Sequence, residues 1–120
     1  MILLSQRTKV YFYTEPVNMR YSFDTLMAKV KYELGRSVFS DSIFLFIGKR
    51  KDKVKALYWD SNGLVLFYKR LEKGRFSIFK EMNKKEIQMS MSELQLFFEG
   101  AKIEKKLPLS PEPMDTSRYA

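Results

Sequence analysis

The chain has 120 residues, of which 45% are hydrophobic and 15% aromatic, and its 22 Lys and Arg against 14 Asp and Glu give a net charge of +8. This length suits one domain, and the apolar content is too high for a disordered chain. The sequence contains no cysteine and no histidine. Disulfides, zinc sites of the usual Cys/His type and catalysis by a Ser-His-Asp or Cys-His arrangement are therefore excluded.

No stretch of the sequence is apolar over the roughly 20 residues that a membrane-spanning helix needs. The longest apolar runs, residues 43–47 and 64–68, have the length of a strand. Residues 1–4 are apolar, but they are too few for a signal peptide and no basic residue precedes them. We therefore expect a cytoplasmic protein that makes no contact with a membrane.

Most of the positive charge lies in one segment. Residues 49–75 contain nine Lys and Arg against three Asp and Glu, a net charge of +6, whereas residues 1–48 carry +2 and residues 76–120 carry zero. A localised basic segment predicts a polyanionic partner such as nucleic acid. The alternative is a lysine-rich, solvated surface without such a partner.

The first third of the chain predicts a strand followed by a helix. Residues 9–13 (KVYFY) form a β-branched and aromatic run that is typical of a strand. Apolar residues then recur at helical spacing between residues 19 and 34, which predicts an amphipathic helix. Asn18 stands where the N-cap belongs, and Gly35 stands where the helix is expected to stop.

The middle of the chain predicts consecutive antiparallel strands. Residues 43–47 are wholly apolar, as in a central strand, and the charged residues 48–53 (GKRKDK) form a turn. Residues 54–59 and 64–71 are the two arms of a hairpin, and residues 75–79 are expected to add a further short strand.

The next segment predicts a short strand and a second helix. Residues 86–89 have strand character. Ser90 and Glu93 have the spacing of a capping box, so we expect a helix over residues 91–99, closed by Gly100. The apolar residues of this helix are expected to pack on the sheet.

These elements predict an α+β fold: a mostly antiparallel meander sheet with one amphipathic helix after the first strand and a short C-terminal helix. Residues 1–106 are expected to form a single domain. Residues 107–120 contain three of the four prolines among polar residues, which predicts a flexible tail.

The hairpin predicts which side chains share a face. If Asn62 and Gly63 form the loop, Lys55 lies opposite Arg70. Like charges directly opposite each other are destabilising, so either a phosphate bridges them in a complex or both side chains extend into water. Whether the loop has two or four residues, the alternation puts the same residues on one face: Lys55, Leu57, Trp59, Leu66, Tyr68 and Arg70.

Two aromatic residues on this face have two interpretations. Trp59 and Tyr68 could stack on nucleic-acid bases, as aromatic residues do on single-strand binding surfaces. The alternative is that Trp59 is a core residue beneath the helix.

The turn at residues 49–53 is the strongest candidate for phosphate contact, because its position exposes it; the alternative is a solvated charged loop. We expect no catalytic residues, no metal and no other cofactor. The candidate nucleic-acid-binding residues are Arg20, Lys49, Arg50, Lys51, Lys53, Lys55, Trp59, Lys69, Arg70, Lys73 and Arg75.

Two ordered motifs resemble a known family. Residues 16–24 (PVNMRYSFD) resemble a motif of the form PVDMRKSFDGL. Residues 54–60 (VKALYWD), Gly63 and residues 68–76 (YKRLEKGRF) resemble the pattern LYWD…G…YKRLE.GRF. Both motifs are typical of TnpB, the second-open-reading-frame accessory protein of insertion sequence sixty-six transposons, which is distinct from the longer RNA-guided nucleases of the same name. The resemblance extends over residues 1–103.

This resemblance implies an accessory protein that supports transposition, while a separate, larger transposase performs the strand chemistry. The implied protein partners are that transposase and the other accessory protein of the element. The sequence departs from the family pattern at Asn18, where Asp is usual, and at Tyr21 and Thr25, where Lys and Gly are common; Ser61 and Asn62 vary the turn.

Two functions follow as hypotheses. The first is a non-catalytic factor that binds DNA at the element ends or at the target, and is thereby associated with the bacterial nucleoid. The alternative is an interaction module that docks on the transposase through an aromatic surface without contacting DNA. A nuclease is a third hypothesis, but residues 104–106 (EKK) supply only a Glu-x-Lys spacing that many charged tails share, and the chain is too short for a two-metal transposase domain.

Overall fold

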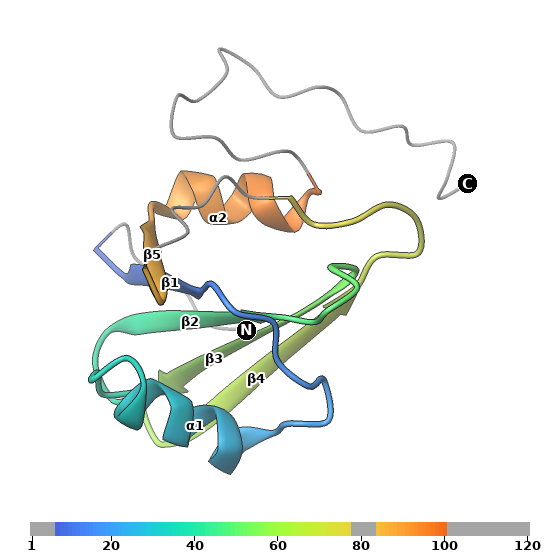
Figure 1. Cartoon of the computed structure of the whole chain (residues 1–120). Coiled ribbons are helices and arrows are strands. Elements are labelled where there is room, and N and C mark those ends of the chain that lie inside the picture. Colours follow the sequence, from blue (N-terminus) through green and yellow to red (C-terminus); the bar gives the residue numbers. More distant parts are fainter. Residues whose placement is uncertain (1–6, 78–83, 101–120) are drawn as a thin grey trace.

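The computed structural model describes residues 7–77 and 84–100, and in these residues five strands form one sheet with a helix on each face (Figure 1). This arrangement confirms the predicted α+β fold. Neither helix of the described residues is long and apolar enough to cross a membrane. The elements, in chain order, are β1 (Lys9–Tyr13), α1 (Phe23–Tyr32), β2 (Ser42–Ile47), β3 (Lys53–Asp60), β4 (Gly63–Arg70), β5 (Glu86–Met89) and α2 (Met91–Phe98).

The sheet has the strand order β4-β3-β2-β1-β5. Strands β2, β3 and β4 form the predicted antiparallel meander, and β5 pairs antiparallel with β1. β1 and β2 are parallel, because α1 carries the chain back along the sheet between them. β2 is the central strand, and all six of its residues are buried, as the wholly apolar run of residues 43–47 predicts.

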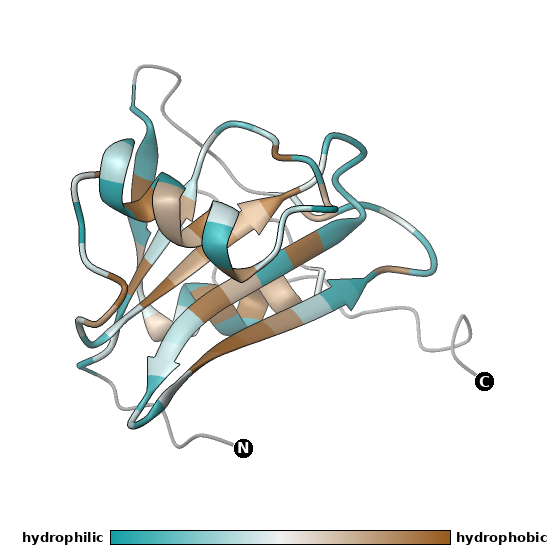
Figure 2. Cartoon of the chain, turned by 90° about the horizontal axis from the view of Figure 1, so that it is seen from below, coloured by the Kyte–Doolittle hydropathy of each residue, from teal (hydrophilic) through white to brown (hydrophobic). Residues whose placement is uncertain are grey.

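Alternate side chains along each strand point to opposite faces of the sheet, and a hydrophobic core forms on each face. Leu26 and Val30 of α1 pack over one face, as predicted, against residues that include Phe44 and Leu57. Leu94 and Phe97 of α2 pack over the other face. Figure 2 shows the hydrophobic stretches of the strands behind α1.

The helix α1 begins later than predicted. Ser22 is its N-cap residue, and the predicted cap, Asn18, lies outside the helix. The Asn18 side-chain oxygen instead accepts a hydrogen bond from the backbone N–H of Arg20 at 2.9 Å, which forms a turn before the helix. The prediction of an Asn18 cap is therefore wrong. Gly35 follows the helix with φ of +63°, a conformation that favours glycine, as its predicted role as the stop requires.

The loop of the β3–β4 hairpin lies one residue earlier than predicted. Ser61 and Asn62 form the two-residue loop, and Gly63 pairs with Asp60 as the first residue of β4. Ser61 has φ of +52°, so this residue, rather than glycine, takes the left-handed position.

This shift changes the partners across the hairpin but keeps the two faces. Lys55 lies opposite Tyr68, and Arg70 lies opposite Lys53, so the prediction that Lys55 faces Arg70 is wrong. The observed register differs from the predicted one by two residues along the partner strand, and side chains alternate with a period of two. The predicted assignment of residues to the two faces is therefore confirmed.

The C-terminal elements match their predictions. β5 and α2 lie where expected, and Ser90 and Glu93 form both hydrogen bonds of the capping box. A strand was predicted over residues 75–79. Residues 75–77 do not form a strand, so the prediction is wrong for these three residues. Residues 78–79, residues 104–106 and the expected tail lie outside the described residues.

Candidate nucleic-acid interface

Two loops meet at the end of the sheet where β2 and β4 finish and β3 begins. The backbone N–H of Leu71, just after β4, donates to the carbonyl oxygen of Asp52 at 2.7 Å. The backbone N–H of Phe76 donates to the carbonyl oxygen of Lys51 at 2.6 Å. These two hydrogen bonds bring the β2–β3 turn and the segment after β4 together, although about 20 residues separate them in the chain.

This junction gathers seven of the predicted binding residues, which we call the basic end. Figure 2 shows the corresponding end of β4 and its loop in the hydrophilic colour. All of these side chains are exposed except that of Lys53, which is half-buried. The basic end consists of Lys49, Arg50, Lys51, Lys53, Arg70, Lys73 and Arg75.

Few carboxylates neutralise the basic end. Asp52 and Glu72 are the acidic residues of its two loops. Glu72 accepts a hydrogen bond from Arg70 at 2.9 Å, and both side chains are more than half exposed, so this ion pair contributes little stability. Among residues 7–77 and 84–100, no other residue of the basic end forms an ion pair. These cations are therefore available to an external anion.

Arg20 lies on the connection between β1 and α1, three residues after Val17, which forms a parallel bridge with Gly48 next to the basic end. The Arg20 side chain is exposed. The carbonyl oxygens of Met19 and Tyr21, on either side of it, accept hydrogen bonds from Lys55 Nζ at 2.7 and 2.6 Å. The backbone that carries Arg20 is therefore fixed against β3.

Lys55 is itself withdrawn from the surface. The residue is only 6% exposed, and its ammonium group also lies 4.8 Å from the centre of the Tyr68 ring. Burial lowers the pKa of Lys55. The Lys55 ammonium group is held by two backbone carbonyl groups, and Arg70 does not lie directly opposite Lys55 in the observed register. Lys55 is therefore not part of the candidate surface.

Two further predicted binding residues, Lys69 and Trp59, make contacts outside the basic end. Lys69 Nζ donates to the carbonyl oxygen of Phe98 at 2.6 Å, at the end of α2, where helix carbonyl groups lack partners. Trp59 packs edge-to-face on Phe39, with ring centres 5.0 Å apart, and belongs to neither buried core. Trp59 lies six residues along β3 from Lys53, about 20 Å at the rise of a strand, so it is far from the basic end.

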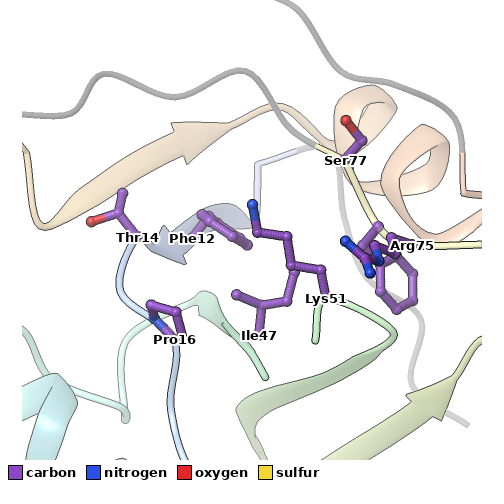
Figure 3. Close-up of a pocket in the computed structure, with 8 residues that line it drawn as sticks. Phe12, Thr14, Pro16, Ile47, Lys51, Arg75 and Ser77 are labelled. Atoms are coloured by element: carbon purple, nitrogen blue, oxygen red, sulfur yellow. The ribbon is translucent and has the colours of Figure 1, made fainter. Parts of the chain in front are cut away.

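A pocket of about 270 Å³ opens beside the basic end, and the sequence did not reveal it (Figure 3). The two cations of its described lining, Lys51 and Arg75, were predicted from the sequence, but the pocket that contains them both was not. The pocket left no motif, because its lining comes from three separate segments of the chain, residues 12–16, 47–51 and 75–77. The pocket is lined by Phe12, Thr14, Pro16, Ile47, Lys51, Arg75, Phe76 and Ser77.

The carboxylates of the structure are dispersed. Within the described ranges, no group of three or more Asp and Glu side chains is placed to hold a metal ion.

Comparisons with known proteins agree with the motifs. Residues 8–107 match the family described as IS66 Orf2 like protein. The uncharacterized protein y4jC of Sinorhizobium fredii (strain NBRC 101917 / NGR234) is 34% identical over 100 residues, which cover 83% of this chain and 85% of that protein. The uncharacterized protein y4hO of the same strain is 32% identical over 76 residues, covering 63% of this chain and 66% of that protein. No solved structure matches the chain. The match over residues 8–107 confirms the resemblance, and the chain belongs to the IS66 Orf2 like family of insertion-sequence proteins.

Proposed function

We propose that this protein is a non-catalytic accessory factor of an insertion sequence that supports transposition by binding DNA through the basic end. The observation that carries the proposal is the convergence of seven cations, from two loops joined by backbone hydrogen bonds, at one end of the sheet. Membership of the IS66 Orf2 like family supports the accessory role.

The binding is electrostatic in origin. Duplex DNA carries one negative charge per about 1.7 Å of its axis, and each phosphate that a cation neutralises releases condensed counterions. Six residues of the basic end have no ion pair with any residue that the structure describes, so they exchange water for phosphate oxygens without losing a described carboxylate partner. Since phosphate contacts carry no sequence information, the basic end positions the protein on DNA.

A salt titration tests the proposal. Fluorescence anisotropy is measured with element-end duplex, random duplex and single strand over a range of salt concentrations. We expect tight binding at low salt with a steep salt dependence. The double substitution Lys49→Gln with Arg50→Gln should weaken binding and reduce the slope of log K against log salt by about 0.9 for each phosphate that is no longer neutralised.

The matched control is Lys9→Gln with Lys31→Gln. Both lysines are exposed, and Lys9 lies at the opposite end of β1 from the basic end. This variant has the same net charge as the first and should bind nearly as the unchanged protein does. Equal losses of affinity in both variants would indicate attraction by overall charge and contradict a localised interface. A protein that binds none of the DNA probes at low salt would refute the proposal.

A second candidate function is docking on the transposase, favoured by the edge strand β4 of the sheet. Among the described residues β4 pairs with β3 alone, and two aromatic residues on its opposite faces, Phe67 and Tyr68, are 45% and 51% exposed. An apolar edge strand of eight residues is a template for pairing with another chain.

Co-purification separates the two functions. Under this second proposal, the protein remains bound to the transposase at high salt after nuclease treatment. Tyr68→Asp should release it, whereas Tyr32→Asp, at an exposed tyrosine on α1, should not. Failure to co-purify at any salt concentration would contradict docking.

A further inference from the structure

The pocket beside the basic end has the chemistry of an anion site. Two cations, Lys51 and Arg75, line it, and among the described residues its lining contains no carboxylate. Figure 3 shows the Lys51 side chain extending across the pocket between Phe12 and Arg75. Within the described residues, neither Lys51 nor Arg75 forms an ion pair.

The floor of the pocket is buried and apolar. Phe12, Ile47 and Phe76 are buried residues of the core, and Phe76 stacks on Phe97 of α2. An apolar floor lowers the local dielectric constant, so cations above it attract an anion more strongly than cations surrounded by water do. The two cations therefore differ in setting from Lys49 and Arg50 of the same end, which do not line the pocket.

The backbone at Lys51 is held in an unusual conformation. Its φ is +63°, in the left-handed region that glycine adopts without steric penalty. Its N–H donates to the Gly48 carbonyl oxygen at 2.9 Å, and its own carbonyl oxygen accepts from Phe76. The chain thus carries a long cationic side chain where glycine would relieve strain, and strain of this kind is concentrated at functional sites.

We infer that the pocket binds one phosphate group of the nucleic acid, held jointly by Lys51 and Arg75. The guanidinium group of Arg75 presents a planar pair of donors that matches two phosphate oxygens, and Lys51 supplies a point charge. This site rests on the proposed DNA-binding function and deepens it: the basic end attracts the duplex, and the pocket fixes one phosphate. That phosphate comes from the internal backbone or from a 5′-phosphorylated end.

A double-mutant cycle tests whether the two cations share one phosphate. Lys51→Gln, Arg75→Gln and the double variant are compared by anisotropy on random duplex, once with 5′-hydroxyl and once with 5′-phosphate ends. We expect each single substitution to weaken binding about tenfold, as loss of a charge-assisted hydrogen bond does. If the two cations acted independently, the fold-losses of affinity of the single variants would multiply in the double variant. We expect the double variant to bind several-fold more tightly than this product predicts, because either substitution already frees the phosphate.

The control cycle uses Lys49→Gln and Arg50→Gln, whose side chains do not line the pocket. These two substitutions should act independently, so the fold-loss of affinity in the double variant should equal the product of the two single fold-losses. Lys51→Gly provides a control for folding: it should keep or raise the melting temperature, because it relieves the left-handed strain, and still weaken binding as Lys51→Gln does.

The two duplexes distinguish the sources of the phosphate. Coupling between Lys51 and Arg75 on both duplexes assigns the pocket to internal phosphates, and coupling on 5′-phosphorylated duplex alone assigns it to strand ends. Absence of coupling on both, in a protein that still binds DNA with a steep salt dependence, overturns the pocket and leaves the basic end intact. A protein that binds neither duplex overturns the DNA-binding function and the phosphate pocket together.

Discussion

The backbone N–H of Phe76 donates a hydrogen bond to the carbonyl oxygen of Lys51 at 2.6 Å, and this bond joins the two loops that carry the basic end. The Phe76 side chain is 1% exposed and stacks on Phe97 of α2, with ring centres 4.8 Å apart. The position of the basic loops is thus linked to the packing of α2 on the sheet.

Shortening Phe76 should therefore weaken the whole domain. Phe76→Ala removes a fully buried ring and is expected to lower the free energy of unfolding by about 3–5 kcal/mol. Phe76→Leu retains most of the apolar volume and should cost less, which keeps the protein folded for comparison. Urea denaturation measures both. A decrease below about 1 kcal/mol for Phe76→Ala would show that the ring is not an integral part of the core.

Lys55 is expected to act on stability rather than on DNA affinity. Lys55→Met keeps the length of the side chain but leaves the carbonyl oxygens of Met19 and Tyr21 without their donor. We expect the free energy of unfolding to fall by about 1–3 kcal/mol.

The measurement for Lys55 has two parts. Thermal unfolding gives the stability, and a salt titration of DNA binding, at a temperature where the variant is folded, gives the slope. An unchanged slope agrees with the buried position of Lys55. A slope reduced by about 0.9 would instead make Lys55 a phosphate-binding residue.

Glu33 should make stability depend on pH in the acidic range. Hydrogen bonds from Lys29 at 2.8 Å and from the Tyr13 hydroxyl at 2.5 Å hold the pKa of Glu33 below its ordinary value of 4.5. Burial, followed by the hydrogen bond to Glu33, raises the pKa of Tyr13. Because the folded pKa of Glu33 is depressed, its contribution is complete above pH 4.5 and is lost as the pH falls through the folded pKa.

Comparison of the unchanged protein with Glu33→Gln measures this contribution. At about pH 6 the variant should be the less stable of the two, and at about pH 3 the difference should shrink. Urea denaturation at both pH values gives the free energies. A constant difference would mean that the charge of Glu33 does not contribute.

Gly48 and Met19 should be energetically coupled. A Cβ atom on Gly48 would lie 2.9 Å from Cγ of Met19, so one of the two must move. Gly48→Ala is therefore expected to lower the free energy of unfolding by about 1–3 kcal/mol. Met19→Ala removes the clashing atom, so the double variant should be more stable than the sum of the single effects predicts. Additive effects would show that Met19 already accommodates the methyl group.

Local patterns predicted most of the fold. The capping box of Ser90 and Glu93, the apolar face of α1 and the alternation along β3 and β4 depend on residues a few positions apart, so the sequence contains them directly. The predictions that were wrong depend on more distant contacts. Asn18 has the side chain of an N-cap, but the chain around Arg20 is held against β3 by Lys55, and the helix starts only at Phe23.

Sequence patterns were enough to identify the family, the α+β fold and the concentration of positive charge in residues 49–75. The folded structure was needed to show which of those charges face the solvent. Lys55 and Lys69 are withdrawn because carbonyl oxygens remote in the chain accept their hydrogen bonds. Lys51 and Arg75 are brought to one pocket because backbone hydrogen bonds join their loops. Such contacts between distant segments produce no periodic pattern in the sequence, since they depend on how the loops and helices pack against the folded sheet.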